Sequence, residues 1–239
     1  MGNLNDEKIQ KVLARVGLGS RRQIEQWILN KRIIVNNKVA AIGDRITPSC
    51  QVKLDGNIVD ISHKPETDRI LIYNKPLGEI CTRYDPEGRT NVFENLPSLT
   101  SRKRWVMVGR LDINSQGLLL FTTNGDYANK LMHPSHKIAR RYKVRAYGEI
   151  SQAQIKKLTE GVMLEDGMAR FDKIKLVRKL GNNSWYDISI TSGKNRIIRR
   201  MLASQNLSVN KLIRVSYGSY ALPSELKQSN YQYVKFLEL

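Results

Sequence analysis

The sequence is poor in cysteine, histidine and acidic residues, and each shortage narrows the possible functions. The two cysteines, Cys50 and Cys81, are too few for a disulfide framework, and their apolar surroundings suit small buried side chains. The chain has three histidines, and His133 and His136 have the spacing H-x-x-H. Because a zinc site needs three or four ligands, so few histidines and cysteines indicate that the protein holds no metal.

Long apolar runs are also missing. None approaches the ~20 residues that a membrane-spanning helix requires. The first residues contain neither an apolar signal segment nor the Ser or Thr of a myristoylation site. We therefore expect a cytoplasmic protein with no membrane partner. The 239 residues are enough for one or two domains with sizeable cores.

The shortage of acidic residues leaves a strongly basic chain. Forty Lys and Arg stand against 22 Asp and Glu, a net charge of +18. This excess favours a polyanionic partner. The basic residues gather in three groups, Arg102, Lys103, Arg104 and Arg110, then Lys137, Arg140, Arg141, Lys143 and Arg145, then Lys194, Arg196, Arg199, Arg200, Lys211 and Arg214. The third group lies in a stretch, 189–215, without any acidic residue. A surface that is merely soluble mixes charges of both signs, so these groups predict contacts with phosphates.

The N-terminal part reads as a small unit, residues 1–60. The pattern predicts a helix over 7–16, and a second helix that Ser20 opens with Gln23 placed for a capping box. A hairpin with a tight turn at Asn36-Asn37 and a strand at 52–54 follow. The fragments KVLA, GSRR, IIVN and GD in this order resemble the S4 RNA-binding domain. The resemblance implies that several cations of this unit face RNA phosphates: Arg15, Arg21, Arg22, Lys31, Arg32 and Lys38.

Residues 61–67, which include Pro65, are expected to form a linker, and residues 68–239 a second domain. This domain begins with the apolar strand 69–74. Strands and short helices then alternate without a regular βαβ rhythm. Ser151 and Gln154 predict a helix that ends at Gly161, and another is expected from about 195 to 203. The pattern predicts an α+β fold with a mixed, mainly antiparallel sheet.

The most informative stretch is GRLDINSQGLLLFTTNGD, residues 109–126. Asp112 follows an Arg on a short turn between two apolar runs, 105–108 and 118–121, that read as buried strands. A carboxylate on a loop between rigid strands is well placed for catalysis. Taken alone, the same residue is more typical of a turn Asp that caps its own backbone.

This stretch resembles the signature of the RsuA/RluB branch of RNA pseudouridine synthases. The match covers GRLD and the later GLLLFTT, and further resemblance lies at GEICTR, DPEGR and NKLMHPS. The resemblance extends over nearly the whole chain and implies the pseudouridine synthase fold. It also implies that Asp112 is the catalytic carboxylate of an enzyme that isomerises a uridine in ribosomal RNA. The substrate that we expect first is 23S RNA of the large subunit.

Two further catalytic residues are implied by the resemblance. Tyr142, in RRYKV, matches a family motif whose aromatic ring can stack on a flipped base and whose hydroxyl can accept the C5 proton. Without the motif, Tyr142 reads as a core or cross-strand residue. Arg199, in GKNRIIRR, matches the family Arg that pairs with the catalytic Asp. The residues expected to contact RNA in this domain are Arg110, which resembles the Arg that fills the gap left by the flipped base, and Arg140, Lys194, Arg196 and Arg200.

The implied reaction is redox-neutral and consumes no water, so it demands neither cofactor nor metal. Its partner is ribosomal RNA, free or in a pre-50S particle, and we expect a monomer. Two other classes remain as alternatives. A non-catalytic RNA-binding or ribosome-assembly protein would need none of the three catalytic residues, and a metal-dependent nuclease would want more carboxylates near Asp112.

Overall fold

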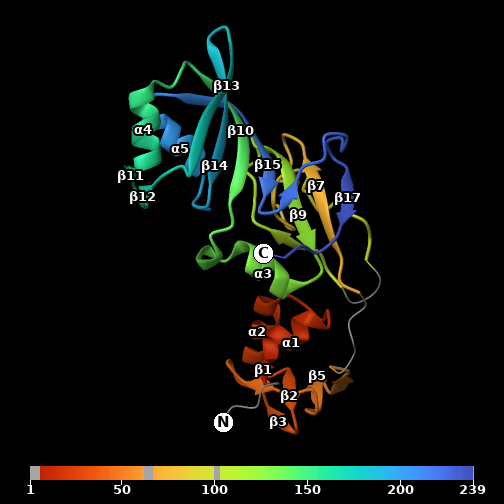
Figure 1. Cartoon of the computed structure of the whole chain (residues 1–239). Helices are drawn as coiled ribbons and strands as arrows, with labels where there is room; N and C mark the ends of the chain where they lie inside the picture. Colours follow the sequence, from red (N-terminus) through yellow and green to blue (C-terminus); the bar gives the residue numbers. More distant parts are fainter. Residues whose placement is uncertain (1–5, 62–66, 100–102, 239) are drawn as a thin grey trace. The chain divides into compact units, whose positions relative to one another are not determined.

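The computed structural model describes residues 6–61, 67–99 and 103–238. The chain forms two compact units (Figure 1). The first unit consists of Met1–Asp68 and Ser98–Trp105, and the second of Arg69–Pro97 and Val106–Leu239. The segment 98–105 thus groups with the first unit, where Lys103 Nζ lies 3.2 Å from a carboxylate oxygen of Asp68. Residues 62–66 of the expected linker lie outside the described residues.

The first unit has its own core. Its elements are β1 (Glu7–Lys8), α1 (Ile9–Arg15), α2 (Arg21–Leu29), β2 (Ile33–Val35), β3 (Lys38–Val39), β4 (Arg45–Ile46), β5 (Val52–Leu54) and β6 (Asn57–Val59). Strands β3, β2, β5 and β6 form one antiparallel sheet in that order, and β1 pairs with β4. Leu13, Ile24, Ile33 and Val52 are fully buried together, so the two helices and the sheet share one cluster.

Local signals in the sequence fix the ends of these elements. Ser20 Oγ accepts a hydrogen bond from Gln23 N–H at 3.1 Å and so caps α2. Asn36 and Asn37 both have positive φ, 46° and 66°, as the tight turn between β2 and β3 requires. The predicted cap and the predicted hairpin are therefore confirmed.

The second unit is built on a nine-stranded sheet with the order β13-β14-β10-β15-β9-β7-β17 (Figure 1). Strand β8 pairs with β9, and β16 pairs with β15. The pairing of β15 with β9 is parallel and all the others are antiparallel, which confirms the α+β class with a mixed, mainly antiparallel sheet. The strands of this unit are β7 (Ile70–Lys75), β8 (Val106–Val108), β9 (Gln116–Thr122), β10 (Arg140–Tyr147), β11 (Val162–Leu164), β12 (Gly167–Ala169), β13 (Lys173–Leu180), β14 (Asn183–Ile190), β15 (Ser208–Tyr217), β16 (Tyr220–Ala221) and β17 (Tyr231–Val234).

Three α-helices pack against this sheet: α3 (Gly125–Met132), α4 (Gln152–Glu160) and α5 (Ile197–Ala203). A 3₁₀ turn, η1 (Pro134–His136), follows α3. Helices α4 and α5 share a core with β10 and β14, and α3 shares a second core with β7, β8 and β9. The capping box predicted at Ser151 and Gln154 is present at the start of α4. No helix among the described residues is long and apolar enough to cross a bilayer.

The parallel pairing of β9 and β15 depends on Gly117. Its φ of +99° is unfavourable for any other residue, and a Cβ atom there would lie 2.3 Å from the Arg214 carbonyl oxygen. Since the neighbour is backbone inside a sheet, it cannot move aside without breaking the pairing. Gly117 therefore allows the strand that follows Asp112 to join the centre of the sheet.

We expect Gly117→Ala to lower the free energy of unfolding by about 3 kcal/mol or more, because the methyl group meets the β15 backbone. The measurement is urea unfolding, with Gly125→Ala as the matched control. Gly125 opens α3, and no atom lies within 4 Å of the place that its methyl group would take, so this change should be neutral or stabilise by up to about 1 kcal/mol. Equal stability of the two variants would show that the close approach does not matter.

Candidate active site

Asp112 lies on the turn between β8 and β9 and lines a cavity of about 1180 Å³. The side chain is 30% exposed, so its carboxylate is reachable from the cavity. Other walls come from the segment 80–89, from the start of β10 and from the loop that precedes α5. The carboxylate of Asp85 is also in the wall, but it is bound to Arg89 at 2.7 Å.

The backbone of the Asp112 turn is held by hydrogen bonds to every carbonyl group of residues 112–115. Ser115 N–H closes the turn on the Asp112 carbonyl at 3.0 Å, and Gly78 N–H donates to the Ile113 carbonyl at 3.0 Å. Arg199 Nη2 donates to the Asn114 carbonyl at 2.8 Å, and Lys75 Nζ donates to the Ser115 carbonyl at 3.0 Å. The sequence therefore folds into a turn that cannot shift without breaking bonds to two distant segments, residues 75–78 and α5.

Lys75 is completely buried at the end of β7. Its Nζ also donates to the Pro76 carbonyl at 3.0 Å, so the ammonium binds backbone oxygens in place of water. Burial lowers the pKa of Lys75, while the charges of Cys81, Glu79 and Asp112 oppose that shift. Lys75 is not among the residues predicted from the sequence, because a Lys at the end of an apolar strand carries no signal that it will be buried.

The structure corrects the predicted pairing of Arg199 with Asp112. The ion pair to the Asp112 carboxylate comes from Arg196 Nη1, at 3.6 Å. Arg199 instead donates to two carbonyl groups, those of Val209 at 2.7 Å and Asn114 at 2.8 Å. Burial and the nearby Arg196 lower the pKa of Arg199, and the Asp112 charge acts against this shift.

The physical reason is the position of the helix start. Helix α5 begins at Ile197, two residues later than the sequence pattern predicts, and Arg196 precedes it in the left-handed conformation with φ of 45°. This places the Arg196 side chain toward the carboxylate. Arg199, half a turn into the helix, reaches the backbone of the Asp112 turn.

Two cross-strand pairs lie beside the turn on β10 and β15. Arg140 pairs with Tyr217, and Tyr142 pairs with Arg214. The Arg140 guanidinium lies 4.7 Å from the Tyr217 ring centroid, donates to the Tyr217 hydroxyl at 2.8 Å and donates to the Thr191 carbonyl at 2.6 Å. Arg140 and Tyr217 both line the cavity, and these contacts fix the guanidinium as part of its wall.

Tyr142 is 9% exposed and packs in the core with Leu111, the residue before Asp112. Its neighbour Arg214 is 2% exposed and therefore cannot make the phosphate contact expected of it. Arg214 Nε donates to the Leu118 carbonyl at 2.8 Å, and its Nη1 lies 3.5 Å from the Arg110 carbonyl. Arg214 Nη2 is buried without a hydrogen-bond partner among the described residues. A buried cation thus lies beneath the chain that leads into and out of the turn.

Two cations of the third basic group are bound within the protein. Arg200 donates two hydrogen bonds to Asp166, at 2.8 and 2.9 Å, and Lys194 Nζ lies 3.7 Å from the same carboxylate. Asp166 lies on the hairpin between β11 and β12, outside the acid-free stretch of sequence. Lys194 and Arg196 still line the cavity, as does the exposed Arg110.

Among the six residues of the first unit that are predicted to contact RNA, two bind acidic side chains of the protein. Arg15 forms an ion pair with Glu7, and Arg32 is bound to Asp55 at 2.8 Å and lies over the Trp27 ring. Both arginines nevertheless remain exposed, as do the other four: Arg21, Arg22, Lys31 and Lys38. The proposed phosphate contacts of these six residues stay a prediction.

Comparison with known proteins agrees with this architecture. Residues 69–204 match the family described as RNA pseudouridylate synthase, and residues 7–49 match the S4 domain. The chain is 49% identical over 229 residues, 95% of its length, to a protein of Haemophilus influenzae named ribosomal large subunit pseudouridine synthase B. The chain belongs to the RNA pseudouridylate synthase family.

Other members give the same result. Proteins of the same name from Pasteurella multocida and from Escherichia coli O6:H1 are each 48% identical over 95% and 94% of this chain. The chain spans 64% and 66% of the length of the Haemophilus and Pasteurella proteins and 78% of the Escherichia protein. A solved pseudouridylate synthase superposes with a TM-score of 0.66, covers 96% of both chains and is 20% identical, which shows a shared fold.

Within the part of the chain that the structure describes, no group of three or more His, Cys, Asp or Glu side chains is placed to hold a metal ion. The cavity wall thus contains two carboxylates, Asp112 and the Arg89-bound Asp85, together with several arginines and lysines and the Tyr217 ring. This arrangement suits chemistry on a polyanion through the Asp112 carboxylate.

Substitutions of Arg199 and Arg200 test whether the hydrogen bond from Arg199 to the turn positions Asp112. We expect Arg199→Ala to lower the turnover number for pseudouridine formation about 100-fold, because misplacing a reacting group by about 1 Å has an effect of this size. Arg200→Ala removes a bond to Asp166 only, so turnover should stay within about threefold of the wild type. Single-turnover assays on an rRNA transcript measure both, and equal losses would mean that the bond from Arg199 to the turn does not position Asp112.

Proposed function

We propose that this protein isomerises a uridine to pseudouridine in ribosomal RNA, with Asp112 as the reacting carboxylate. The observation that carries the proposal is the Asp112 carboxylate itself. It faces a cavity large enough for a nucleotide, on a turn fixed through four carbonyl groups. RNA binding alone requires no such group.

The reaction breaks the N1–C1′ bond of the uridine, turns the base and forms a C5–C1′ bond. The C5 proton leaves and N1 gains a proton, so atoms and electrons balance without a cofactor. The carboxylate contributes in one of two ways: it attacks C1′ as a nucleophile, or it removes a proton from the sugar and so starts elimination. In both, the uridine must leave its stack and enter the cavity.

The other residues of the cavity have separate tasks in this proposal. Arg196, 3.6 Å from Asp112, stabilises the negative carboxylate. Arg199 and Lys75 fix the turn through its carbonyl groups. In this proposal the exposed Lys137 contacts a phosphate beside the flipped nucleotide, and the exposed Arg110 fills the gap that the flipped base leaves in the stack.

The names of the relatives support a choice of substrate. Those that share 46–49% of their residues with this chain are named ribosomal large subunit pseudouridine synthase B. We therefore propose 23S RNA as the substrate, either free or in a pre-50S particle, and a monomeric enzyme whose S4 unit adds RNA affinity. The basic groups and the S4 domain support this choice of partner.

The test of the function uses Asp112→Asn. The wild-type protein should introduce pseudouridine at a defined position of an unmodified 23S rRNA transcript, and chelator should not affect this. Asp112→Asn should abolish the product and keep RNA affinity within about threefold, since phosphate contacts supply the affinity. Pseudouridine mapping and filter binding measure the two effects. Residual turnover above a few per cent would remove Asp112 from the chemistry.

Two substitutions of Tyr142 distinguish a role in base stacking from a role in proton transfer. If the ring only stacks, Tyr142→Phe keeps activity and Tyr142→Leu loses it; if the hydroxyl accepts the C5 proton, both lose activity. Because Tyr142 is packed in the core, Tyr186→Leu is the matched control. Tyr186 lies in the same core on the neighbouring strand, and its change should cost stability without the specific loss in turnover. Full activity of Tyr142→Leu would show that Tyr142 has no role.

A further inference from the structure

Strand β10, which carries Arg140 and Tyr142, has a second face that the proposed reaction does not use. Side chains alternate along β10, so Arg140, Tyr142, Val144 and Ala146 point to the side of the cavity and of the core. Helices α4 and α5 cover that side. Arg141, Lys143 and Arg145 point to the opposite side.

The opposite side is densely basic. Strand pairing sets Arg141 beside Ser189 and Lys173 in one row, and Lys143 beside Asp187 and Lys175 in the next. A third row contains Lys211, Arg145, Trp185 and Arg178. We call the seven cations of these rows the outer basic face: Arg141, Lys143, Arg145, Lys173, Lys175, Arg178 and Lys211.

Negative charge is almost absent from this sheet region. Strands β10, β13, β14 and β15 contain ten Lys and Arg and one acidic residue, Asp187; the three cations outside the outer basic face are Arg140, Lys179 and Arg214. A sheet face that serves solubility alone carries both signs side by side. Seven cations on adjacent strands repel one another, and a bound polyanion removes this repulsion.

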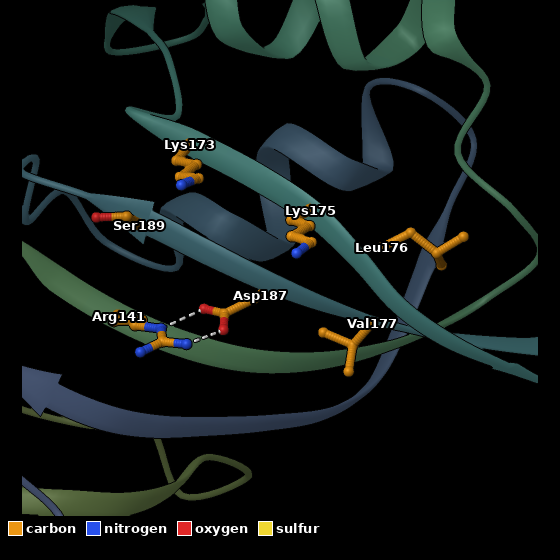
Figure 2. A pocket seen from close by; sticks show the side chains of 7 residues that line it. All are labelled: Arg141, Lys173, Lys175, Leu176, Val177, Asp187 and Ser189. Atoms are coloured by element: carbon orange, nitrogen blue, oxygen red, sulfur yellow. Dashed lines mark hydrogen bonds and ion pairs between the residues drawn. The ribbon is translucent and has the colours of Figure 1, made fainter.

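Asp187 orients a cation and does not neutralise the face. Arg141 Nε donates to Asp187 at 2.6 Å, and Nη2 binds the second carboxylate oxygen, so the guanidinium is held in one plane. The Arg141 side chain is 58% exposed and that of Asp187 is 18% exposed. Figure 2 shows this pair beside Lys173 and Lys175, around a hollow of about 660 Å³. The fixed guanidinium leaves Nη1 outside the pair, available for an anionic oxygen.

Aromatic side chains accompany the cations. Trp185 is half-buried in the third row, with the Arg178 guanidinium 5.9 Å from its ring centroid. Tyr147, at the end of β10, is largely exposed on the same side. Cations in rows with interspersed rings are typical of surfaces that follow a nucleic-acid backbone and stack on its bases.

We propose that the outer basic face binds a second segment of RNA, on the side of the sheet opposite to the cavity of Asp112. This second RNA site rests on the proposed function only because both sites are expected to bind RNA. The substrate would then be a folded RNA with two segments in contact with opposite sides of the catalytic unit, and this face would contribute affinity but no chemistry.

The test is a triple variant, Lys143→Gln, Lys173→Gln and Lys175→Gln, with an unmodified 23S rRNA transcript as the probe. The matched control, Lys156→Gln, Lys157→Gln and Lys227→Gln, removes the same charge from lysines outside the face. Filter binding over a series of KCl concentrations should give about tenfold weaker affinity for the face variant and a log K against log salt slope shallower by about 2. The control should stay within about twofold, and both variants should keep the wild-type melting temperature.

Turnover at saturating RNA separates this proposal from the proposed function. The face variant should keep the wild-type turnover number and show a raised KM. A wild-type protein that makes no pseudouridine yet shows the same binding differences would refute the function and leave the second RNA surface standing. Unchanged affinity and slope in the face variant, or equal losses in both variants, would overturn the proposal.

Discussion

The hydrogen bonds that hold residues 112–115 are the constraint on which the rest of the site depends. Two of the donors come from residues 75–78, at and just after the end of β7, and a third comes from α5, far away in the sequence. The Asp112 turn is thus formed only when the sheet and α5 are both in place. A carboxylate held in this way needs no reorganisation when the substrate arrives, and such preorganisation is a main source of enzymatic rate.

Cations lie on two sides of the same turn, two of them buried in the protein and one at the cavity. Lys75 and Arg214 are buried beneath it and are bound mainly to carbonyl oxygens. Arg196 lies at the cavity itself, 3.6 Å from Asp112. Burying cations whose hydrogen bonds go to carbonyl groups and not to a carboxylate is costly, so we infer that their positive potential serves the site. This potential favours a polyanion in the cavity.

Much of the fold was predictable because the deciding signals are local. Ser20, Ser151 and the Asn36-Asn37 turn each fix an element through bonds to residues a few positions away, and apolar runs mark the central strands. The specific stretch 109–126 likewise led to the family and to Asp112. These features require only neighbouring residues in the chain.

The remaining features depend on contacts between distant segments. Asp166 lies 28 and 34 residues from Lys194 and Arg200, so an acid-free stretch of sequence was mistaken for a surface of free cations. Burial of Arg214 follows from its place between β10 and β9 in the sheet, which periodicity does not reveal. The partner of Asp112 depends on where α5 starts, and an error of two residues is enough to choose the wrong Arg.

The most direct measurement of the central claim is a crystal structure of Asp112→Asn bound to the RNA substrate. We expect a flipped uridine in the cavity, with its C1′ atom next to residue 112, its base near Tyr142 and the turn 112–115 unmoved. A uridine bound elsewhere, or a turn whose carbonyl groups have exchanged their donors on RNA binding, would contradict the claim.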